Sequence, residues 1–256
     1  RIDLLVEFRL DGITKKILFE NKTWTSTNKK QLQKYKEGFP DLYKYFYLKL
    51  AYINYQERRL IKELDYNYIT SGNLSAALKQ IVHLHPFIQQ YWDYLNQTFV
   101  EFINSFNVNL FENKNFKILW NGQAQEYLMD ILFEKLENKL TYLKYKTGSS
   151  SGRPWTELDI ARKENIYGNN WEFLFWRIDI RIGKFYIRLN QYAYIKKANN
   201  SDFNQKKKER LKILREIASD IKLKYNLKAG KLSNSGVNES EIIIFFLQDN
   251  NMKTLI

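Results

Sequence analysis

The dipeptide Asp11-Gly12 constrains the fold of this chain more than any other feature of its sequence. It lies between two apolar runs, residues 2–8 and 17–19, and an Asp-Gly pair in that setting is the strongest short-range signal of a two-residue hairpin turn. In such a turn Leu10 pairs with Ile13, and the register of the other pairs along the two antiparallel strands follows from that one. The chain is therefore predicted to open with a β-hairpin of defined register.

Two carboxylates meet in this register. Counting back from the turn places Asp3 opposite Glu20, and directly opposed side chains have Cβ atoms about 4.5–5.5 Å apart. Carboxylates at that distance repel each other, so a divalent cation such as Mg²⁺, which prefers oxygen ligands, is the natural reason for the pair. Lys22 lies two residues after Glu20 and so shares its strand face. The group predicts a metal site that activates water, and a surface hairpin with scattered charge is the alternative.

A basic segment with helical spacing follows the hairpin. Gln31 and Tyr35 are four residues apart and share one face of the predicted helix. Candidate N-caps at residues 25–28 mark its start. By itself the segment is a solvated amphipathic helix with Leu32 as its core contact. Beside an acidic hairpin, it predicts a basic helix face that contacts phosphate groups. The lysines around this helix are Lys29, Lys30, Lys34 and Lys36.

These residues resemble the PD-(D/E)XK nuclease superfamily, most closely the exonuclease-type branch that carries a Gln-x-x-x-Tyr motif on the following helix. The similarity covers residues 1–52 and continues more weakly at residues 152–156 and 175–179. It implies a restriction-endonuclease-like sheet core flanked by helices, and hydrolysis of phosphodiester bonds that depends on Mg²⁺ or Mn²⁺. The motifs that carry the resemblance are Arg1-Ile2-Asp3-Leu4-Leu5, Ile17-Leu18-Phe19-Glu20-Asn21-Lys22 and Gln31-x-x-x-Tyr35.

The resemblance also implies a role for each motif residue. Metal binding would fall to Asp3, Glu20 and the main-chain carbonyl of Asn21, while Lys22 would lie near the attacking water. The residues that would position the substrate or support the site are Gln31 and Tyr35. Because the superfamily usually has a helix before its first motif strand and this chain begins inside the motif, we expect the sequence to be a fragment.

The charge of the chain favours an anionic partner. The formal net charge is +13, and residues 196–231 hold 12 Lys and Arg against 4 Asp and Glu. Such a surface favours nucleic acid, here DNA, and makes binding sensitive to salt because neutralised phosphates release counterions. A solvated lysine-rich helix and an anionic membrane surface are the alternatives for the basic segment.

Cysteine is absent, which excludes disulfides and thiolate zinc sites and is compatible with a reducing compartment. The longest apolar run, residues 242–247, is far shorter than a membrane span. We therefore expect a cytoplasmic protein that does not cross a membrane.

The spacing of apolar residues predicts a mixed α/β (α+β) chain in two parts. Residues 1–147 would form the nuclease-like core with additional helices, and residues 155–256 an α+β region packed on it. Between them, residues 148–152 contain two glycines and three serines and predict a domain boundary or a mobile loop. Further predicted elements are strands at 43–52, 66–70 and 241–248 and helices at 73–82, 86–106 and 123–143.

The C-terminal part is predicted to contain a hairpin of residues 171–181 and 184–196 that turns near Gly183. Arg177 and Arg188 would share its polar face and contact a nucleic-acid backbone, with a solvated sheet face as the alternative. After the hairpin comes a basic helix, residues 203–223. The predicted buried stripe of this helix is Leu211, Leu214, Ile217 and Ala218.

The sequence supports three functional hypotheses. The first is a metal-dependent nuclease acting on DNA, favoured because the Asp3, Glu20 and Lys22 set is intact. The second is a catalytically inactive module with the nuclease fold that binds DNA or protein. The third is a structural protein whose aromatic C-terminal half docks a partner.

Overall fold

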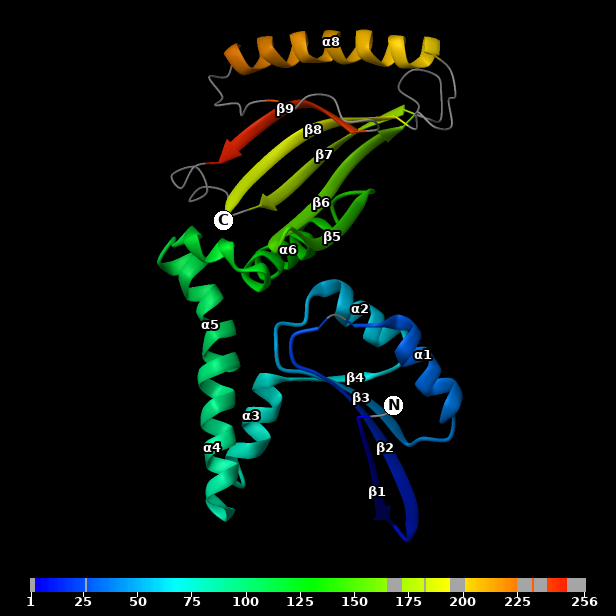
Figure 1. The fold of residues 1–256 in the computed structure, drawn as a ribbon, viewed down its shortest axis with the longest axis vertical. Helices are drawn as coiled ribbons and strands as arrows, with labels where there is room; N and C mark the ends of the chain where they lie inside the picture. The colour runs from blue at the N-terminus through cyan, green and yellow to red at the C-terminus, as the bar shows by residue number, and fades with distance from the viewer. Residues whose placement is uncertain are drawn as a thin grey trace. The chain divides into compact units, whose positions relative to one another are not determined.

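The computed structural model describes residues 3–25, 27–164, 172–181, 183–193, 201–224, 232 and 239–247. These residues form a mixed α+β chain with two separate sheets (Figure 1). Contacts divide the chain into two units, Arg1–Glu112 and Asn113–Ile256. This division lies well before the predicted linker at 148–152.

Unit 1 is built on a mixed four-stranded sheet with the order β1-β2-β3-β4. β1 (Leu4–Leu10) is antiparallel to β2 (Ile13–Lys22). β3 (Lys44–Lys49) then runs parallel to β2, and β4 (Asn67–Thr70) runs parallel to β3 at the edge. The parallel strands require crossover connections, so a helix stands between each of them and the next.

The β1–β2 hairpin has the register predicted from its turn. Leu10 pairs with Ile13, and the pairing continues without a shift along β1. Asp11 and Gly12 have φ angles of 51° and 76°, which is the left-handed conformation that a two-residue hairpin turn requires at both central positions. The prediction is confirmed for this local element, on which the position of Asp3 depends.

Two capped helices cover one face of the unit 1 sheet (Figure 1). α1 (Lys29–Gly38) connects β2 to β3 and begins at Asn28, whose side chain caps it. α2 (Tyr55–Glu63) connects β3 to β4 and begins with a capping box between Asn54 and Glu57. The core between these helices and the sheet consists of Leu18, Leu32, Tyr35, Tyr45, Tyr47, Ile53, Ile61 and Tyr66.

A helical arm completes unit 1. The predicted helix at 86–106 is present, but a π-helical turn interrupts it. Leu95 and Phe99 from this region pack with Leu50 in a second small core. The helical segments of the arm are α3 (Ser71–Lys79), η1 (Val82–Leu84), α4 (Pro86–Leu95), η2 (Asn96–Val100), α5 (Glu101–Asn107) and η3 (Val108–Glu112).

Unit 2 contains a five-stranded antiparallel sheet in which each described strand pairs with the next along the chain. α6 (Gly122–Leu136) follows the short helix η4 (Phe116–Trp120) and packs on β5 and β6. α8 (Ser201–Lys224) packs on β9. The strands are β5 (Leu143–Ser150), β6 (Arg153–Glu164), β7 (Glu172–Arg181), β8 (Lys184–Ala193) and β9 (Glu239–Leu247).

Unit 2 differs from three sequence-based expectations. The Gly- and Ser-rich residues 148–152 end β5 and turn into β6, with Ser150 paired to Arg153, and the division into two units lies elsewhere, at residues 112–113. The helix predicted at 123–143 ends at Leu136, because β5 begins soon after it. Ile217 is 51% exposed, so it does not belong to the buried stripe of α8.

The expected hairpin near Gly183 is confirmed, because β7 and β8 pair up to Arg181 and Lys184 on either side of it. Within the described residues, no helix has both the length and the apolar composition that crossing a bilayer requires.

Candidate functional site

Glu20 is the centre of the candidate site. It lies near the end of β2, on the sheet face covered by α1 and α2, and its side chain is fully buried. Neither of its carboxylate oxygens has a hydrogen-bond partner. A buried carboxylate normally costs free energy unless it is paired and hydrogen-bonded. The only ion pair recorded for Glu20 in the described residues is with the ammonium group of Lys22.

A chain of polar contacts leads from Lys22 into α1. The Nζ of Lys22 donates to Oε1 of Gln31 at 3.3 Å, and Nε2 of Gln31 donates to the hydroxyl of Tyr35 at 2.8 Å. Tyr35 is buried in the core under the helix. At the start of α1, Oδ1 of Asn28 accepts from the backbone N–H of Gln31 at 3.2 Å. The structure thus brings together the lysine and the Gln-x-x-x-Tyr pair that the sequence singled out.

Asp3 lies at the same end of the hairpin. Leu4, the first residue of β1, pairs with Phe19, and Asp3 directly precedes it. Oδ2 of Asp3 accepts from the backbone N–H of Asn21 at 2.8 Å, and the side chain of Asp3 is exposed. Asp3 therefore lies at the solvent boundary of the site, while Glu20 lies inside.

The main chain of Asn21 offers a further oxygen at this edge. The carbonyl of Lys22 accepts from Leu50 on the β3 side at 3.1 Å. Because the backbone groups of successive strand residues point to opposite edges, the carbonyl of Asn21 points to the β1 side. The N–H of Asn21 points to that side as well, where it meets Asp3.

These groups suit a hard divalent cation. Mg²⁺ is typically held by one or two carboxylates, and it keeps several of its waters. Glu20, Asp3 and the Asn21 carbonyl could supply oxygen ligands, and neither oxygen of Glu20 has a hydrogen bond. Within the described residues no group of three or more His, Cys, Asp or Glu forms a candidate metal centre, so a cation at Glu20 would need main-chain and water ligands in addition to the two carboxylates.

The predicted nucleic-acid lysines of α1 face solvent. Lys29, Lys30 and Lys34 are all exposed, while Leu32 and Tyr35 of the same helix are buried. The ammonium groups of these lysines are therefore exposed to solvent, while the opposite face of the helix packs on the sheet and supports the site.

A second buried ion pair adjoins the site and was not singled out from the sequence. Nζ of Lys49, at the end of β3, donates to both oxygens of Glu57 on α2 at 2.8 and 2.6 Å. Glu57 also accepts from the backbone N–H and the hydroxyl of Thr27, both at 3.1 Å. Thr27 lies in the loop between β2 and α1, so this pair ties that loop to the neighbouring strand and helix.

Tyr47 lies among the acids at this end of the sheet. Its side chain is fully buried, and its hydroxyl lies 2.9 Å from that of Thr27, whose single proton is shared between Tyr47 and Glu57. Burial raises the pKa of Tyr47 well above its usual value, and the charges of Glu57 and Glu20 add to the rise, although the Thr27 hydrogen bond opposes it. Tyr47 is therefore a neutral hydroxyl at physiological pH.

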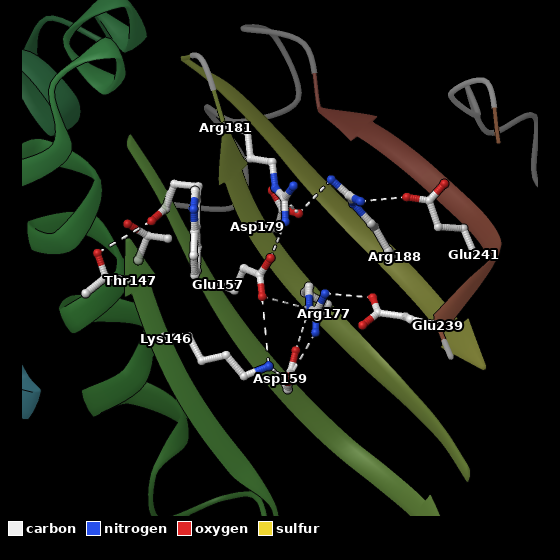
Figure 2. Close-up of polar contacts among 12 residues, drawn as sticks. Lys146, Thr147, Glu157, Asp159, Arg177, Asp179, Arg181, Arg188, Glu239 and Glu241 are labelled. Atoms are coloured by element: carbon white, nitrogen blue, oxygen red, sulfur yellow. Dashed lines mark hydrogen bonds and ion pairs between the residues drawn. The ribbon is translucent and has the colours of Figure 1, made fainter. Parts of the chain in front are cut away.

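Arg177 and Arg188 have a different setting from the one predicted. Arg177 is 5% exposed and binds Asp159 at 2.5 Å and Glu239 at 2.7 Å. Arg188 contacts Asp179 and Glu241, each at 2.6 Å (Figure 2). Carboxylates occupy both guanidinium groups, so the face is neither solvated nor open to a phosphate backbone. The alternation of polar and apolar residues along β7 correctly placed Arg177 on a polar face of the sheet, but the charged side chains of that face form a buried ion-pair network.

Asp179 is the most buried acid of this network. It is fully buried and makes ion pairs with Arg181 at 3.2 Å and with Arg188. Burial raises the pKa of Asp179 to about 6, although both arginines lower it. Burial also raises the pKa of Glu239. These shifts belong to the packing of unit 2.

A surface cavity of about 450 Å³ lies at the other end of β2. It is lined by residues 14–16 and 38–43 and contains none of the candidate site residues. We assign the site by the chemistry of its side chains, because the cavity holds no group of converging acids.

Comparisons with protein-family models, with curated proteins and with solved structures find no match to this chain. Its membership of a nuclease superfamily therefore stays a prediction, and function is argued from the site itself.

Proposed function

We propose that unit 1 is the core of a Mg²⁺-dependent nuclease of restriction-endonuclease-like fold that hydrolyses phosphodiester bonds of DNA. The observation that carries the proposal is Glu20, fully buried with two oxygens that lack hydrogen bonds and with the amine of Lys22 beside it. A buried acid whose recorded charged partner, within the described residues, is a single lysine is a functional-site candidate.

The surrounding fold supports the proposal. A hairpin is followed by α1, a parallel strand, α2 and a second parallel strand, which is a sheet flanked by helices. Asp3, Glu20 and Lys22 come from this hairpin, and Gln31 and Tyr35 come from the helix directly after it. The order of the motifs along the chain therefore matches their proximity in space.

The residues would divide the work of hydrolysis. Glu20, Asp3 and the carbonyl of Asn21 would hold the metal ion, which supplies charge neutralisation and lowers the pKa of a bound water. Lys22 would stabilise negative charge on the reacting phosphate or orient the water. Gln31 would fix the position of the Lys22 ammonium through the observed hydrogen bond.

The exposed lysines of α1 would hold the DNA. Phosphate contacts by Lys29, Lys30 and Lys34 release counterions, so the affinity should fall steeply as salt rises. Arg177 and Arg188 are left out of this surface because their guanidinium groups are already paired.

Cleavage of linear and circular DNA tests the proposal. The wild type should cleave with Mg²⁺ or Mn²⁺ and stop when a chelator is added, while Asp3→Ala, Glu20→Ala and Lys22→Ala should remain folded by circular dichroism and inactive. Lys16→Ala is the matched control, since Lys16 lies on the same strand and face but is exposed at the far end, and it should retain activity. Metal-dependent cleavage by all three site variants would refute the assignment.

The same assay separates the alternative function. DNA retention that weakens with salt, without cleavage under any metal condition, would identify a binding module that has the fold but not the activity.

A further inference from the structure

Two lysines lie side by side at the end of the unit 1 sheet. Lys22 of β2 and Lys49 of β3 are register partners on neighbouring parallel strands, so their side chains share a face. Like charges directly opposite each other are destabilising. The structure resolves the conflict by giving each ammonium its own carboxylate, Glu20 for Lys22 and Glu57 for Lys49.

The Lys49–Glu57 pair is buried and rigidly held. Lys49 is 5% exposed and Glu57 6%. Glu57 completes the capping box of α2 by accepting from the backbone N–H of Asn54 at 3.4 Å, and it also accepts two hydrogen bonds from Thr27. A carboxylate with this many partners has little freedom to leave Lys49.

The register places Glu20 diagonally across from Lys49 on the neighbouring strand. In the register Glu20 is opposite Tyr47, two residues before Lys49 on the same face. That diagonal spans about 8 Å between Cα atoms, within the combined reach of a lysine and a glutamate side chain. A second ammonium at Glu20 would compete with any cation for its oxygens.

We infer that Glu57 is a positioning residue that holds the Lys49 ammonium away from Glu20 and so keeps the Glu20 carboxylate available to a divalent cation. The inference rests on the proposed metal-dependent function and deepens it, because it explains how one face carries two lysines and still presents an acid. Glu57 acts through Lys49 and does not itself contact the reacting atoms.

Charge removal and charge rescue test the inference in the full chain. Glu57→Gln keeps a hydrogen-bond acceptor for Thr27 but no longer neutralises Lys49, so Mn²⁺ affinity, followed by electron paramagnetic resonance, should fall at least about tenfold. The double variant Lys49→Met/Glu57→Gln has no loose ammonium and should bind Mn²⁺ within about threefold of the wild type. Glu63→Gln is the control, since Glu63 is in an exposed ion pair with Arg59 on the same helix.

A purely structural role for Glu57 predicts the opposite pattern. The double variant would then bind Mn²⁺ as weakly as Glu57→Gln or more weakly, because both partners of the restraint are lost, and that result would overturn the inference. Unchanged affinity in Glu57→Gln would overturn it as well, while leaving the nuclease proposal intact.

A second readout needs no metal. Urea unfolding can measure the coupling free energy between Glu20 and Lys49 by a double-mutant cycle. The cycle uses Glu20→Gln, Lys49→Met and the two changes together, and it is made once in the wild type and once in Glu57→Gln. The coupling should appear only in the Glu57→Gln background, and its absence there would overturn the inference. If the coupling appears but the wild type binds no Mn²⁺, the positioning effect stands and the metal-dependent nuclease fails.

Discussion

The two units of this protein bury charge in contrasting ways. In unit 2, Arg177 binds both Asp159 and Glu239, so the charges of the network saturate one another. In unit 1, Glu20 has one amine beside it and no hydrogen bond. Removing one partner of a buried pair is costly, whereas a complete network has no demand left for a ligand. The contrast is the reason we place the proposed metal site at Glu20 and not in the larger cluster of unit 2.

The contrast has exceptions in unit 2. Neither oxygen of Asp179 has a hydrogen-bond partner, and neither has Nε of Arg181 or Arg188, although these arginines form ion pairs with Asp179. Asp179 and Glu20 each lie two residues before the last residue of their strand, so position along the strand does not separate them. The two acids differ in their charged partners, because Asp179 pairs with two arginines and Glu20 with one lysine.

The largest expected effect comes from Lys22→Met. Cleavage should fall at least about a thousandfold, because Lys22 is proposed to stabilise charge on the reacting phosphate. Glu20 would also be left buried without a cation, which should lower the unfolding free energy by about 3 kcal/mol when no metal is present. Added Mg²⁺ should then raise the melting temperature of the variant more than that of the wild type, measured by calorimetry. Equal shifts in both proteins would mean that Glu20 does not bind the ion.

Arg177→Met should break the saturated network of unit 2. Asp159 and Glu239 would lose their shared partner, and the unfolding free energy of unit 2 should fall by about 3–5 kcal/mol. Hydrogen exchange of peptides from β6 and β7 would report the loss, while Mn²⁺ affinity at the unit 1 site should stay unchanged. Arg59→Met, which removes an exposed charge from α2, should have little effect on stability. A comparable loss of unfolding free energy in Arg177→Met and Arg59→Met would show that the buried network stabilises unit 2 no more than an exposed ion pair stabilises unit 1.

The raised pKa of Asp179 predicts that the buried network of unit 2 makes stability depend on pH. Its folded value of about 6 lies above its usual value of 3.8, so between these values the folded state binds more protons than the unfolded state. Stability from this group is therefore greatest at low pH and is lost as pH rises from about 4 to about 6, by about 3 kcal/mol in all. Urea unfolding at several pH values should show this slope in the wild type relative to Asp179→Asn. Parallel profiles would place the pKa of Asp179 near its ordinary value.

The smallest expected effect is that of Asn28→Ala. The variant removes the side chain that caps α1 and accepts from the N–H of Gln31, which should cost about 1 kcal/mol. Since Gln31 contacts Lys22, a modest loss of cleavage should accompany the loss of stability. Asn73→Ala, which removes part of the capping box at α3, should lower stability without changing cleavage.

The sequence predicted the parts of the site that depend on local geometry. The turn at Asp11-Gly12 fixes the hairpin register, and a spacing of four residues puts Gln31 and Tyr35 on one helical face. Both relations involve one element or two adjacent strands. The contact of Lys22 with Glu20 agrees with their two-residue spacing on one strand, whereas the contact of Lys22 with Gln31 depends on how α1 packs on the sheet.

The parts that were missed depend on non-local pairing. Lys49 approaches Lys22 through the parallel register of β2 and β3 and approaches Glu57 through the packing of α2, and no local pattern encodes either relation. Alternation along β7 placed Arg177 on a polar face but could not show that strands far along the chain supply its carboxylates. Glycine and serine at 148–152 suit a tight turn as well as a linker, so composition could not separate them.

The two-residue turn also bears on how this hairpin can change over generations. Side chains along a strand alternate between faces, so one inserted or deleted residue at Asp11-Gly12 would slide β1 by a step and turn Asp3 away from Glu20. Replacing one amino acid with another within Leu4–Leu10 leaves that alignment in place. In any lineage that keeps the site, we therefore expect the hairpin to tolerate substitutions but not insertions or deletions.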